Sequence, residues 1–335
     1  AQSDDDLALP RGTVTSERFE LGRNFCNKLW NASRFALMNL EGYEPEALAP
    51  QSLLIEDRWL LSRQATVTSA VTTALAEFRY ADAARELYSY AWDDFCSFYV
   101  EISKARFAVP EQRPVAQRVL AHALDTLLRL LHPMIPFLTE EVWHLLGTVA
   151  PDRGLTPSTP TPSICIAPWP ESIGDHIDAD IEKQFAQFQE VMGAVRNIRT
   201  ENNIPPKETV NFSVRCDASA QSLLTPMLPY FESMARATAT EMGPDVALPE
   251  RVASKAVQGM EIHLDISEFF DVDAEKKRLA GEKEKLTKYV QSVQGKLSND
   301  RFVSRAPADV VQAERDKLAE VEEKLAAVEA ALGKL

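Results

Sequence analysis

Histidine and cysteine are the residues that most often carry catalysis or bind metals, and this chain has few of either. Its histidines are His122, His132, His144, His176 and His263, and its cysteines are Cys26, Cys96, Cys165 and Cys216. No H-x-x-H, H-x-x-x-H or C-x-x-C pair occurs among them. No glycine-rich loop follows a strand-like segment, and no G-x-S-x-G sequence is present. We therefore expect no catalytic site and no metal site, and reduced thiols rather than disulfides.

Two of the histidines and two nearby acidic residues have simpler explanations than catalysis. His132 and His144 lie in apolar, helix-like surroundings, which favours packing or helix capping. Glu140 and Glu141 stand at the start of a short predicted helix, where negative charge complements the helix dipole. We predict structural roles for all of them.

The segment 17–40 carries the polar residues that most need a function. Its apolar stripe predicts an amphipathic helix and consists of Phe25, Leu29, Ala32, Ala36 and Leu40. The opposite face carries amides and cations, with aromatic residues at its margins: Asn24, Asn27, Lys28, Asn31 and Arg34, with Trp30 and Phe35. Asparagine is a weak helix former because its amide competes with the backbone for hydrogen bonds. A helical face built from several asparagines therefore indicates a role beyond helix formation.

Composition narrows the class of protein. The chain has 335 residues, 45% of them hydrophobic, which predicts two or three folded domains, and only 12 glycines, which favours helices. The net charge of −14 disfavours indiscriminate binding to nucleic acid, so any RNA contact requires local basic patches. The chain shows no signal-peptide pattern and no apolar run of membrane-spanning length. We expect a cytoplasmic protein that contacts neither membrane nor DNA.

The periodicity predicts a mainly α protein in three parts. Residues 1–170 are predicted to form an antiparallel helical bundle followed by a Pro-rich connection. Its helices are expected at 17–40, 55–80, 82–106 and 113–132, with a fifth that begins at Pro136 and is capped by Gly147. Residues 171–268 are predicted to form a small α/β subdomain. Its helices are expected at 177–203 and 219–240, and its strands in the alternating runs 208–216 and 259–267, which pair within one sheet.

Residues 269–335 carry a heptad pattern broken at 298–307, which predicts an antiparallel coiled-coil hairpin. Oligomerisation through the same heptads is the alternative, but the short arms favour a hairpin. Residues 275–305 carry nine cations and four acids, a net charge of +5, whereas residues 309–335 carry four cations and seven acids, a net charge of −3. Attraction between the arms and a phosphate-binding face both explain this asymmetry.

Several stretches together resemble the C-terminal half of the bacterial-type valyl-tRNA synthetase family, from about residue 17 to 335. They are GRNFCNKLWNASRFALMN, LHPMIPFLTEEVWHLL, VRNIRTENNIPPKETV and the heptad hairpin. The first two resemble the anticodon-binding bundle shared by the valyl, isoleucyl and leucyl enzymes. The hairpin favours the valyl family, as does the absence of the C-terminal zinc-binding cysteines seen in many isoleucyl enzymes.

This resemblance implies a class I aminoacyl-tRNA synthetase, a ligase of protein biosynthesis that attaches valine to tRNA(Val) using ATP. The H-I-G-H and K-M-S-K-S signatures and the editing domain are absent here. ATP with magnesium therefore belongs to a catalytic domain outside this chain, and we expect the chain alone to be inactive, monomeric and without a cofactor. The alternative is a helical coiled-coil scaffold or oligomerisation module that binds no nucleic acid.

The resemblance further implies two tRNA contacts. The bundle would bind the anticodon stem-loop, whose unstacked bases suit amides and aromatic rings and whose phosphates attract cations. The candidates are Arg23, Asn24, Asn27, Lys28, Asn31, Arg34 and Phe35. The hairpin would meet the outer corner of the tRNA, with Lys276, Lys277, Arg278, Lys283, Lys288, Lys296, Arg301, Phe302 and Arg305 as candidates.

Each of these candidates has a structural alternative. Residues on the polar face of the first helix could bridge to neighbouring helices of the bundle, and Phe302 could close the coiled coil. The aromatic stripe of Trp92, Phe95, Phe98 and Tyr99 favours a core role over RNA stacking. Lys104 and Arg106, at the end of that stripe, are weaker candidates for contact with the RNA backbone.

Overall fold

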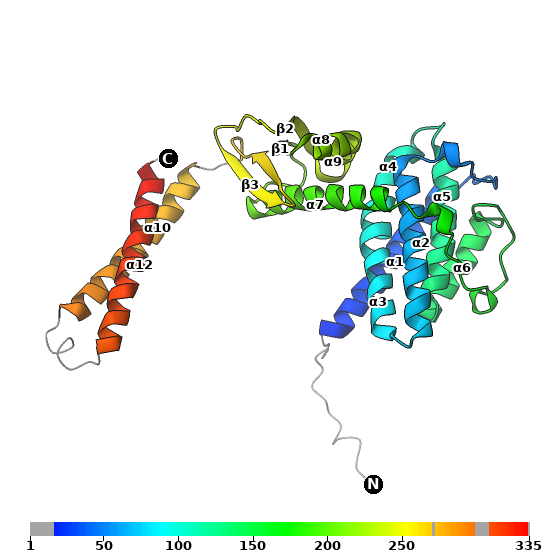
Figure 1. Ribbon diagram of the computed structural model, residues 1–335, viewed down its shortest axis with the longest axis horizontal. Coiled ribbons are helices and arrows are strands. Elements are labelled where there is room, and N and C mark those ends of the chain that lie inside the picture. The colour runs from blue at the N-terminus through cyan, green and yellow to red at the C-terminus, as the bar shows by residue number, and fades with distance from the viewer. Residues whose placement is uncertain (1–16, 270–271, 299–307, 334–335) are drawn as a thin grey trace, which may run out of the picture. The chain divides into compact units, whose positions relative to one another are not determined.

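The computed structural model describes residues 17–269, 272–298 and 308–333. The chain divides into two compact units. Unit 1 comprises the described residues up to 248 together with 252–265, and unit 2 comprises 249–251 and the described residues from 266 onward. Unit 1 contains both the predicted bundle and the predicted α/β subdomain, because the long helix α7 (Ala179–Glu201) packs against both (Figure 1).

The bundle contains the helices that the apolar periodicity predicted. They are α1 (Glu17–Asn39), α2 (Ile55–Ala76), α3 (Tyr80–Ser89), α4 (Val100–Phe107), α5 (Arg113–Leu131) and α6 (Pro136–Val149). Helices α3 and α4 are joined by a π-helical segment, Tyr90–Tyr99, so the predicted helix at 82–106 is a single helical run with a wider central turn. The apolar stripe of α1 is buried in this bundle, including Leu29, Ala36 and Leu40.

The end of α6 differs from the prediction. Gly147 does not cap the helix, which continues to Val149, and the N–H of Ala150 bonds to the carbonyl of Leu146. Gly147 instead lies beside the guanidinium of Arg153, which stacks over the ring of Trp143 with 4.3 Å between the guanidinium carbon and the ring centre. Arg153 also bonds to Asp125 at 2.7 Å, so this packing extends from α5 to the segment after α6.

The α/β part of unit 1 is a mixed sheet with α7 and two short helices packed on it. Its other elements are β1 (Val210–Arg215), α8 (Ala218–Leu224), α9 (Leu228–Ala235), β2 (Ala237–Gly243), β3 (Val252–Val257) and β4 (Met260–Asp265). The strand order is β2-β1-β4-β3, with β1 parallel to β2 and antiparallel to β4. The two predicted strands are therefore β1 and β4, and their pairing is confirmed.

The predicted helix at 219–240 is wrong at its end. Arg236 adopts a left-handed conformation with φ 48°, which stops α9 at Ala235. The next residues, rich in β-branched threonine, form β2 along β1 instead. β3 was not predicted, because none of the residues in this edge strand is buried and its apolar pattern is weak. It pairs with β4 through a tight turn in which Gln258 and Gly259 both have positive φ.

Unit 2 contains two helices, α10 (Val272–Leu297) and α12 (Ala308–Gly333), that pack against each other. Ion pairs join Lys283 to Glu329 and Lys296 to Glu314, so residue numbers rise along one helix as they fall along the other and the pair is antiparallel. The buried residues of these two helices, among those described, follow the heptad pattern: Leu279, Val290, Val293, Val311 and Val328. Among the described residues, no helix is long and apolar enough to span a bilayer.

Candidate RNA interface

The exposed face of α1 holds most of the residues predicted to contact the anticodon. Arg23, Asn24, Asn27, Asn31 and Arg34 are all exposed, while the opposite stripe packs into the bundle. In the described part of the chain, no hydrogen bond or ion pair links the side chains of these five residues to other residues. Bridging to neighbouring helices therefore does not explain them, and their amide and guanidinium groups are available to a ligand.

Lys28 and Phe35, at the margin of the same face, contact other helices. The Nζ of Lys28 donates a 2.6 Å hydrogen bond to Oγ of Ser97 and lies 3.8 Å from the centre of the Trp92 ring. Burial lowers the pKa of Lys28, although the nearby Cys96 and Asp93 oppose this shift. The ring of Phe35 packs against Phe107 with 6.1 Å between centroids. Both side chains thus form the edge of the exposed face rather than its centre.

An aromatic stack that the sequence analysis did not assign lies beside this margin. The ring of Tyr88 stacks between Phe25 and Trp92, with centroid separations of 5.1 Å and 5.7 Å. Tyr88 and Trp92 are half-buried, so part of each ring reaches the surface near Lys28. The four-residue spacing between Tyr88 and Trp92 was visible in the sequence, but only packing shows that they adjoin α1. The predicted core role of Phe95, Phe98 and Tyr99 is confirmed by their burial, whereas Trp92 is only partly covered.

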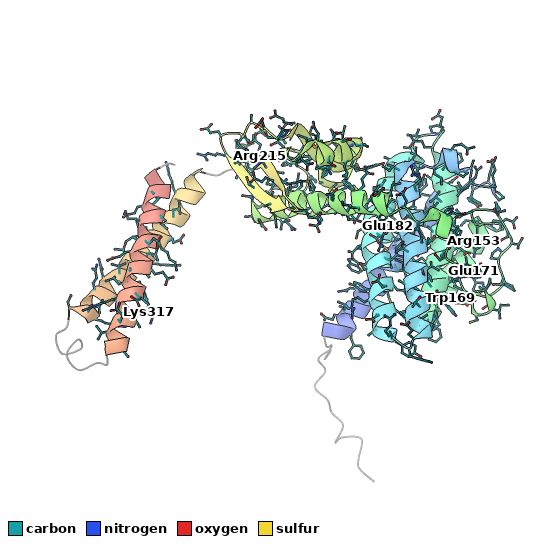
Figure 2. The ribbon with its side chains drawn as sticks, viewed as in Figure 1. Arg153, Trp169, Glu171, Glu182, Arg215 and Lys317 are labelled. Carbon is teal, nitrogen blue, oxygen red and sulfur yellow. The ribbon has the colours of Figure 1, made fainter. Side chains whose placement is uncertain are left out.

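A polar network holds the π-helical segment that carries Trp92. Asp94 in this segment accepts hydrogen bonds from Arg63 at 3.1 Å and from Gln189 at 3.2 Å. Arg63 also pairs with Glu182 at 3.1 Å, and Glu182 lies where α7 meets the bundle (Figure 2). Because Asp94 is buried, these bonds compensate for its lost hydration and secure the segment against α2 and α7.

The weaker prediction for Arg106 is wrong, because this side chain lies in the core with 4% of its surface exposed. Its guanidinium donates two hydrogen bonds to the carboxylate of Asp57, at 2.5 Å and 2.8 Å. Lys104 is exposed and bonds to Glu101 on the same helix at 2.7 Å. Only Lys104 of this pair can reach a ligand.

Some lysines of unit 2 are exposed without a described ion-pair partner, and others form ion pairs. Lys276 and Lys277 are exposed and form no ion pair with any residue that the structure describes, whereas Lys283 and Lys296 pair with acids of α12 at 2.8 Å and 3.8 Å. Lys288 pairs with Glu284 of its own helix at 2.6 Å. Attraction between the arms and a free basic surface therefore coexist. The side chain of Arg278 and the predicted tip residues Arg301, Phe302 and Arg305 lie outside the described part.

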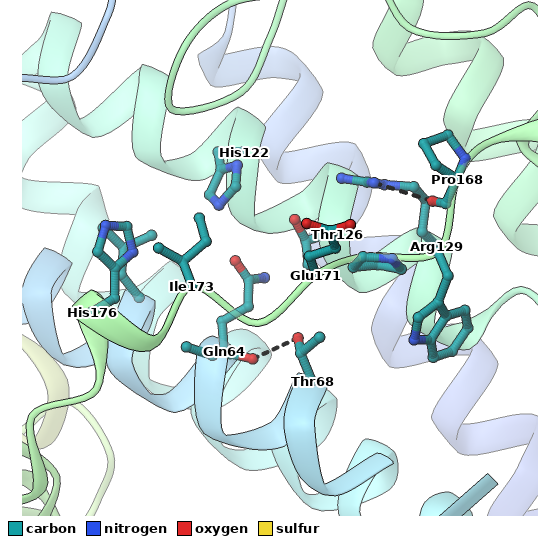
Figure 3. A pocket seen from close by; sticks show the side chains of 13 residues that line it. Gln64, Thr68, His122, Thr126, Arg129, Pro168, Glu171, Ile173 and His176 are labelled. Carbon is teal, nitrogen blue, oxygen red and sulfur yellow. Dashed lines mark hydrogen bonds between the residues drawn. The ribbon is translucent and has the colours of Figure 1, made fainter. Parts of the chain in front are cut away.

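A separate cavity of about 360 Å³ lies between α2, α5 and the segment after α6 (Figure 3). His122, His176 and Arg129 line it, with Glu171 and Gln64 nearby. Burial lowers the pKa of His122 to about 4, although Asp125 opposes this shift, so this imidazole is neutral at physiological pH. Arg129 donates a hydrogen bond to the carbonyl of Pro168 at 3.2 Å and thereby ties the Pro-rich segment to α5.

The structure also brings together side chains that can bind a metal. His132, Glu140 and Cys165 present ligand atoms within 4.8 Å of one another. Their positions in the sequence did not predict this, because they lie just after α5, on α6 and in the connection after α6. The expectation of no metal site was based only on the spacing of His and Cys along the sequence. That spacing cannot show which distant side chains come together in the fold.

Comparison with known proteins defines the class. Residues 57–214, from α2 to β1, match the family model of the anticodon-binding domain of tRNA ligase. Residues 271–335 match the family model of the valyl tRNA synthetase tRNA binding arm. The chain therefore contains the anticodon-binding domain and the tRNA-binding arm of a tRNA ligase. Helix α1 precedes the matched range, so this match does not cover its exposed face.

Three relatives narrow the family further, and all of them are named valine–tRNA ligase. The protein of Rhodopirellula baltica is 50% identical over 331 residues, which are 98% of this chain and 32% of the relative. The protein of Carboxydothermus hydrogenoformans is 38% identical over 304 residues, which are 90% of this chain and 33% of the relative. The protein of Geobacter sulfurreducens is 37% identical over 327 residues, which are 96% of this chain and 36% of the relative. The chain belongs to the valyl-tRNA synthetase family and spans about a third of the length of these relatives.

Proposed function

We propose that this chain recognises tRNA(Val) for a valine–tRNA ligase, and that the exposed face of α1 binds the anticodon stem-loop. The observation that carries this proposal is the row of Asn24, Asn27 and Asn31, which are exposed and whose side chains have no hydrogen-bond partner among the residues that the structure describes. Amides can hydrogen-bond to the edges of unstacked bases, and the rings of Tyr88 and Trp92 beside them offer a stacking surface. Arg23 and Arg34 supply charge for phosphates.

In this proposal, the basic helix α10 binds the outer corner of the tRNA. Lys276 and Lys277 are exposed and pair with none of the described acids, so they can meet phosphates. The exposed pairs of Lys283 and Lys288 contribute little to stability, so these lysines can exchange their carboxylate partners for phosphates. The remaining candidates on this helix and at the tip, including Arg278 and Phe302, stay predictions.

The proposal leaves valine activation to other parts of the enzyme. ATP, with magnesium, would bind a catalytic domain that this chain does not contain, and the chain alone would turn over neither ATP nor valine. We propose that it acts in the cytoplasm as a monomer and consists of three domains, residues 1–170, 171–268 and 269–335. Consumption of ATP with valine by the isolated chain would refute the assignment.

The test is a binding titration against a tRNA(Val) transcript and the same transcript with a changed anticodon. The intact chain should prefer the native anticodon. Asn31→Ala/Arg34→Ala removes one amide and one cation from the α1 face and should weaken binding by about tenfold, since each hydrogen bond contributes about 0.5–1.5 kcal/mol and those to charged groups more. Asn211→Ala/Lys183→Ala removes the same chemistry from exposed positions of β1 and α7 and is the matched control.

Two outcomes would overturn the assignment to α1. The first is equal binding of both transcripts, and the second is an equal loss of affinity in the test and control variants. A mass that rises with protein concentration, together with absent RNA binding, would instead support the alternative of an oligomerisation module.

A further inference from the structure

Three side chains with metal-binding atoms meet at one end of the bundle. His132 follows the last residue of α5, Glu140 lies near the start of α6, and Cys165 lies in the short turn Ile164–Ile166. The Sγ of Cys165 is 3.3 Å from Nε2 of His132 and 3.8 Å from Oε2 of Glu140. Histidine nitrogen, thiolate sulfur and carboxylate oxygen are the ligand atoms of protein zinc sites.

The hydrogen bonds of Thr139 favour the tautomer of His132 that carries its proton on Nδ1. The Thr139 hydroxyl lies 3.0 Å and 3.1 Å from the carbonyl oxygens of Ile135 and Pro136, and its single proton is donated there. Its oxygen lies 2.8 Å from Nδ1 of His132 and therefore accepts the Nδ1 proton. Nε2 is left with a lone pair, which faces Cys165.

The cluster therefore contains more acceptors than protons. The Nε2 lone pair of His132 and the carboxylate of Glu140 both face the sulfur of Cys165. A thiol has one proton and can satisfy only one of them. A cation between the three atoms satisfies all of them at once, and the thiol proton is then released to the buffer.

The surrounding residues orient the ligands as in established metal sites, where ligating groups are themselves hydrogen-bonded. Thr139 holds the ring of His132 through Nδ1. The other oxygen of Glu140, Oε1, lies 3.1 Å from Nε2 of His144, one turn further along α6. Both His132 and Glu140 thus have a second partner that leaves one ligand atom directed at Cys165.

We propose that Cys165, His132 and Glu140 bind one Zn²⁺ ion, with a water molecule as the fourth ligand. Tetrahedral zinc, with bonds of about 2.3 Å to sulfur and about 2.0–2.2 Å to nitrogen or oxygen, places its ligand atoms roughly 3.3–3.7 Å apart. The measured separations from the sulfur, 3.3 Å and 3.8 Å, are close to this range. Thiolate and imidazole select zinc over magnesium or calcium. Cys165 is exposed, so water can reach the fourth position.

Zinc at this site would join the connection after α6 to the bundle. That connection is also held to the bundle by the ion pair of Arg153 with Asp125 and by the hydrogen bond from Nε1 of Trp143 to the carbonyl of Thr161, at 3.0 Å. A metal bond from Cys165 to α5 and α6 would link three segments at one point. The site would then stabilise unit 1 rather than perform chemistry on a substrate.

The experiment titrates the chelator-treated 335-residue chain with Zn²⁺ in competition with a chromogenic chelator, and with Co²⁺ as a spectroscopic substitute. We expect one zinc per chain and a sulfur-to-cobalt charge-transfer band. Cys165→Ser should remove that band and weaken zinc binding by at least about 100-fold, because it deletes a ligand rather than a supporting group. Cys26→Ser changes a cysteine of α1 outside the cluster and should bind like the unmodified chain.

A second variant tests the orientation of His132. Thr139→Val keeps the shape of a buried side chain and removes its hydrogen bond to Nδ1, so zinc affinity should fall by about 10–100-fold while the helical circular dichroism stays unchanged. Substoichiometric zinc, a cobalt spectrum without the sulfur band, or unaltered affinity in Cys165→Ser would each overturn the proposal.

Discussion

Asp57 and Arg106 form a two-bonded ion pair in the core of unit 1, with nitrogen–oxygen distances of 2.5 Å and 2.8 Å. Burial would lower the pKa of Arg106, but hydrogen bonds and charge from Asp57 outweigh it and raise the pKa above its ordinary value. The hydroxyl of Tyr99 donates a further bond to Asp57 at 3.0 Å. Glu56, beside this pair, lies 3.4 Å from the same guanidinium, so one buried cation faces two acids.

Removing one partner of this pair should strongly destabilise unit 1. Arg106→Met leaves the buried carboxylates of Asp57 and Glu56 without their counter-ion, which costs about 3–5 kcal/mol of unfolding free energy. All five tryptophans lie in unit 1, so urea denaturation followed by tryptophan fluorescence reports on it. Glu101→Gln breaks an exposed pair and serves as the control, with an expected loss below about 1 kcal/mol. An equal loss of unfolding free energy in the core variant and in the Glu101→Gln control would contradict a core role for the pair.

The basic helix α10 should account for part of the salt dependence of tRNA binding. Lys276→Ala/Lys277→Ala/Lys288→Ala removes three phosphate contacts, each of which contributes up to about 0.9 to the slope of log affinity against log salt concentration. The slope, measured with tRNA(Val), should therefore become shallower by up to about 2.7. Arg315→Ala/Lys317→Ala/Lys324→Ala makes the same charge change on α12. An unchanged slope in the α10 variant would exclude that helix from the interface.

The ion pair between Lys283 and Glu329 tests the register of the two helices in unit 2. Lys283→Glu should place two acids side by side and weaken the pairing by up to about 1 kcal/mol, because both side chains are about half exposed. Lys283→Glu/Glu329→Lys should restore it. Hydrogen exchange of peptides from α10 measures the local stability, and a double variant less stable than the single one would argue against this register.

The stability of unit 1 should depend on pH through His122. Its folded-state pKa is lowered from 6.5 to about 4, so between these values the unfolded chain binds a proton that the folded chain does not. Unfolding free energy should be fully retained above pH 6.5 and fall toward pH 4, by at most about 1.4 kcal/mol per pH unit from this residue. His122→Gln should flatten the curve obtained from urea denaturation. Parallel curves for the two proteins would show that His122 remains equally easy to protonate after folding.

The sequence predicted most helices of the bundle correctly because apolar spacing reports which side of a helix is buried. The stripe of Phe25, Leu29 and Ala36 was sufficient to orient α1 and to define its polar face. The same reasoning located β1 and β4, whose alternate residues are buried. It failed at β2 and β3, which lie at the sheet edges and bury fewer side chains.

By itself, the sequence determined the helical character of the chain, the exposed amides of α1 and the basic charge of α10, because each depends on neighbours a few positions apart. Only the tertiary structure decided which cations remain available. It placed Arg106 against Asp57, 49 positions away, and Lys28 against Ser97, 69 positions away. It also decided that Cys165 meets His132. Such pairs depend on how whole elements pack, and local periodicity carries no information about which side chains then come within bonding distance.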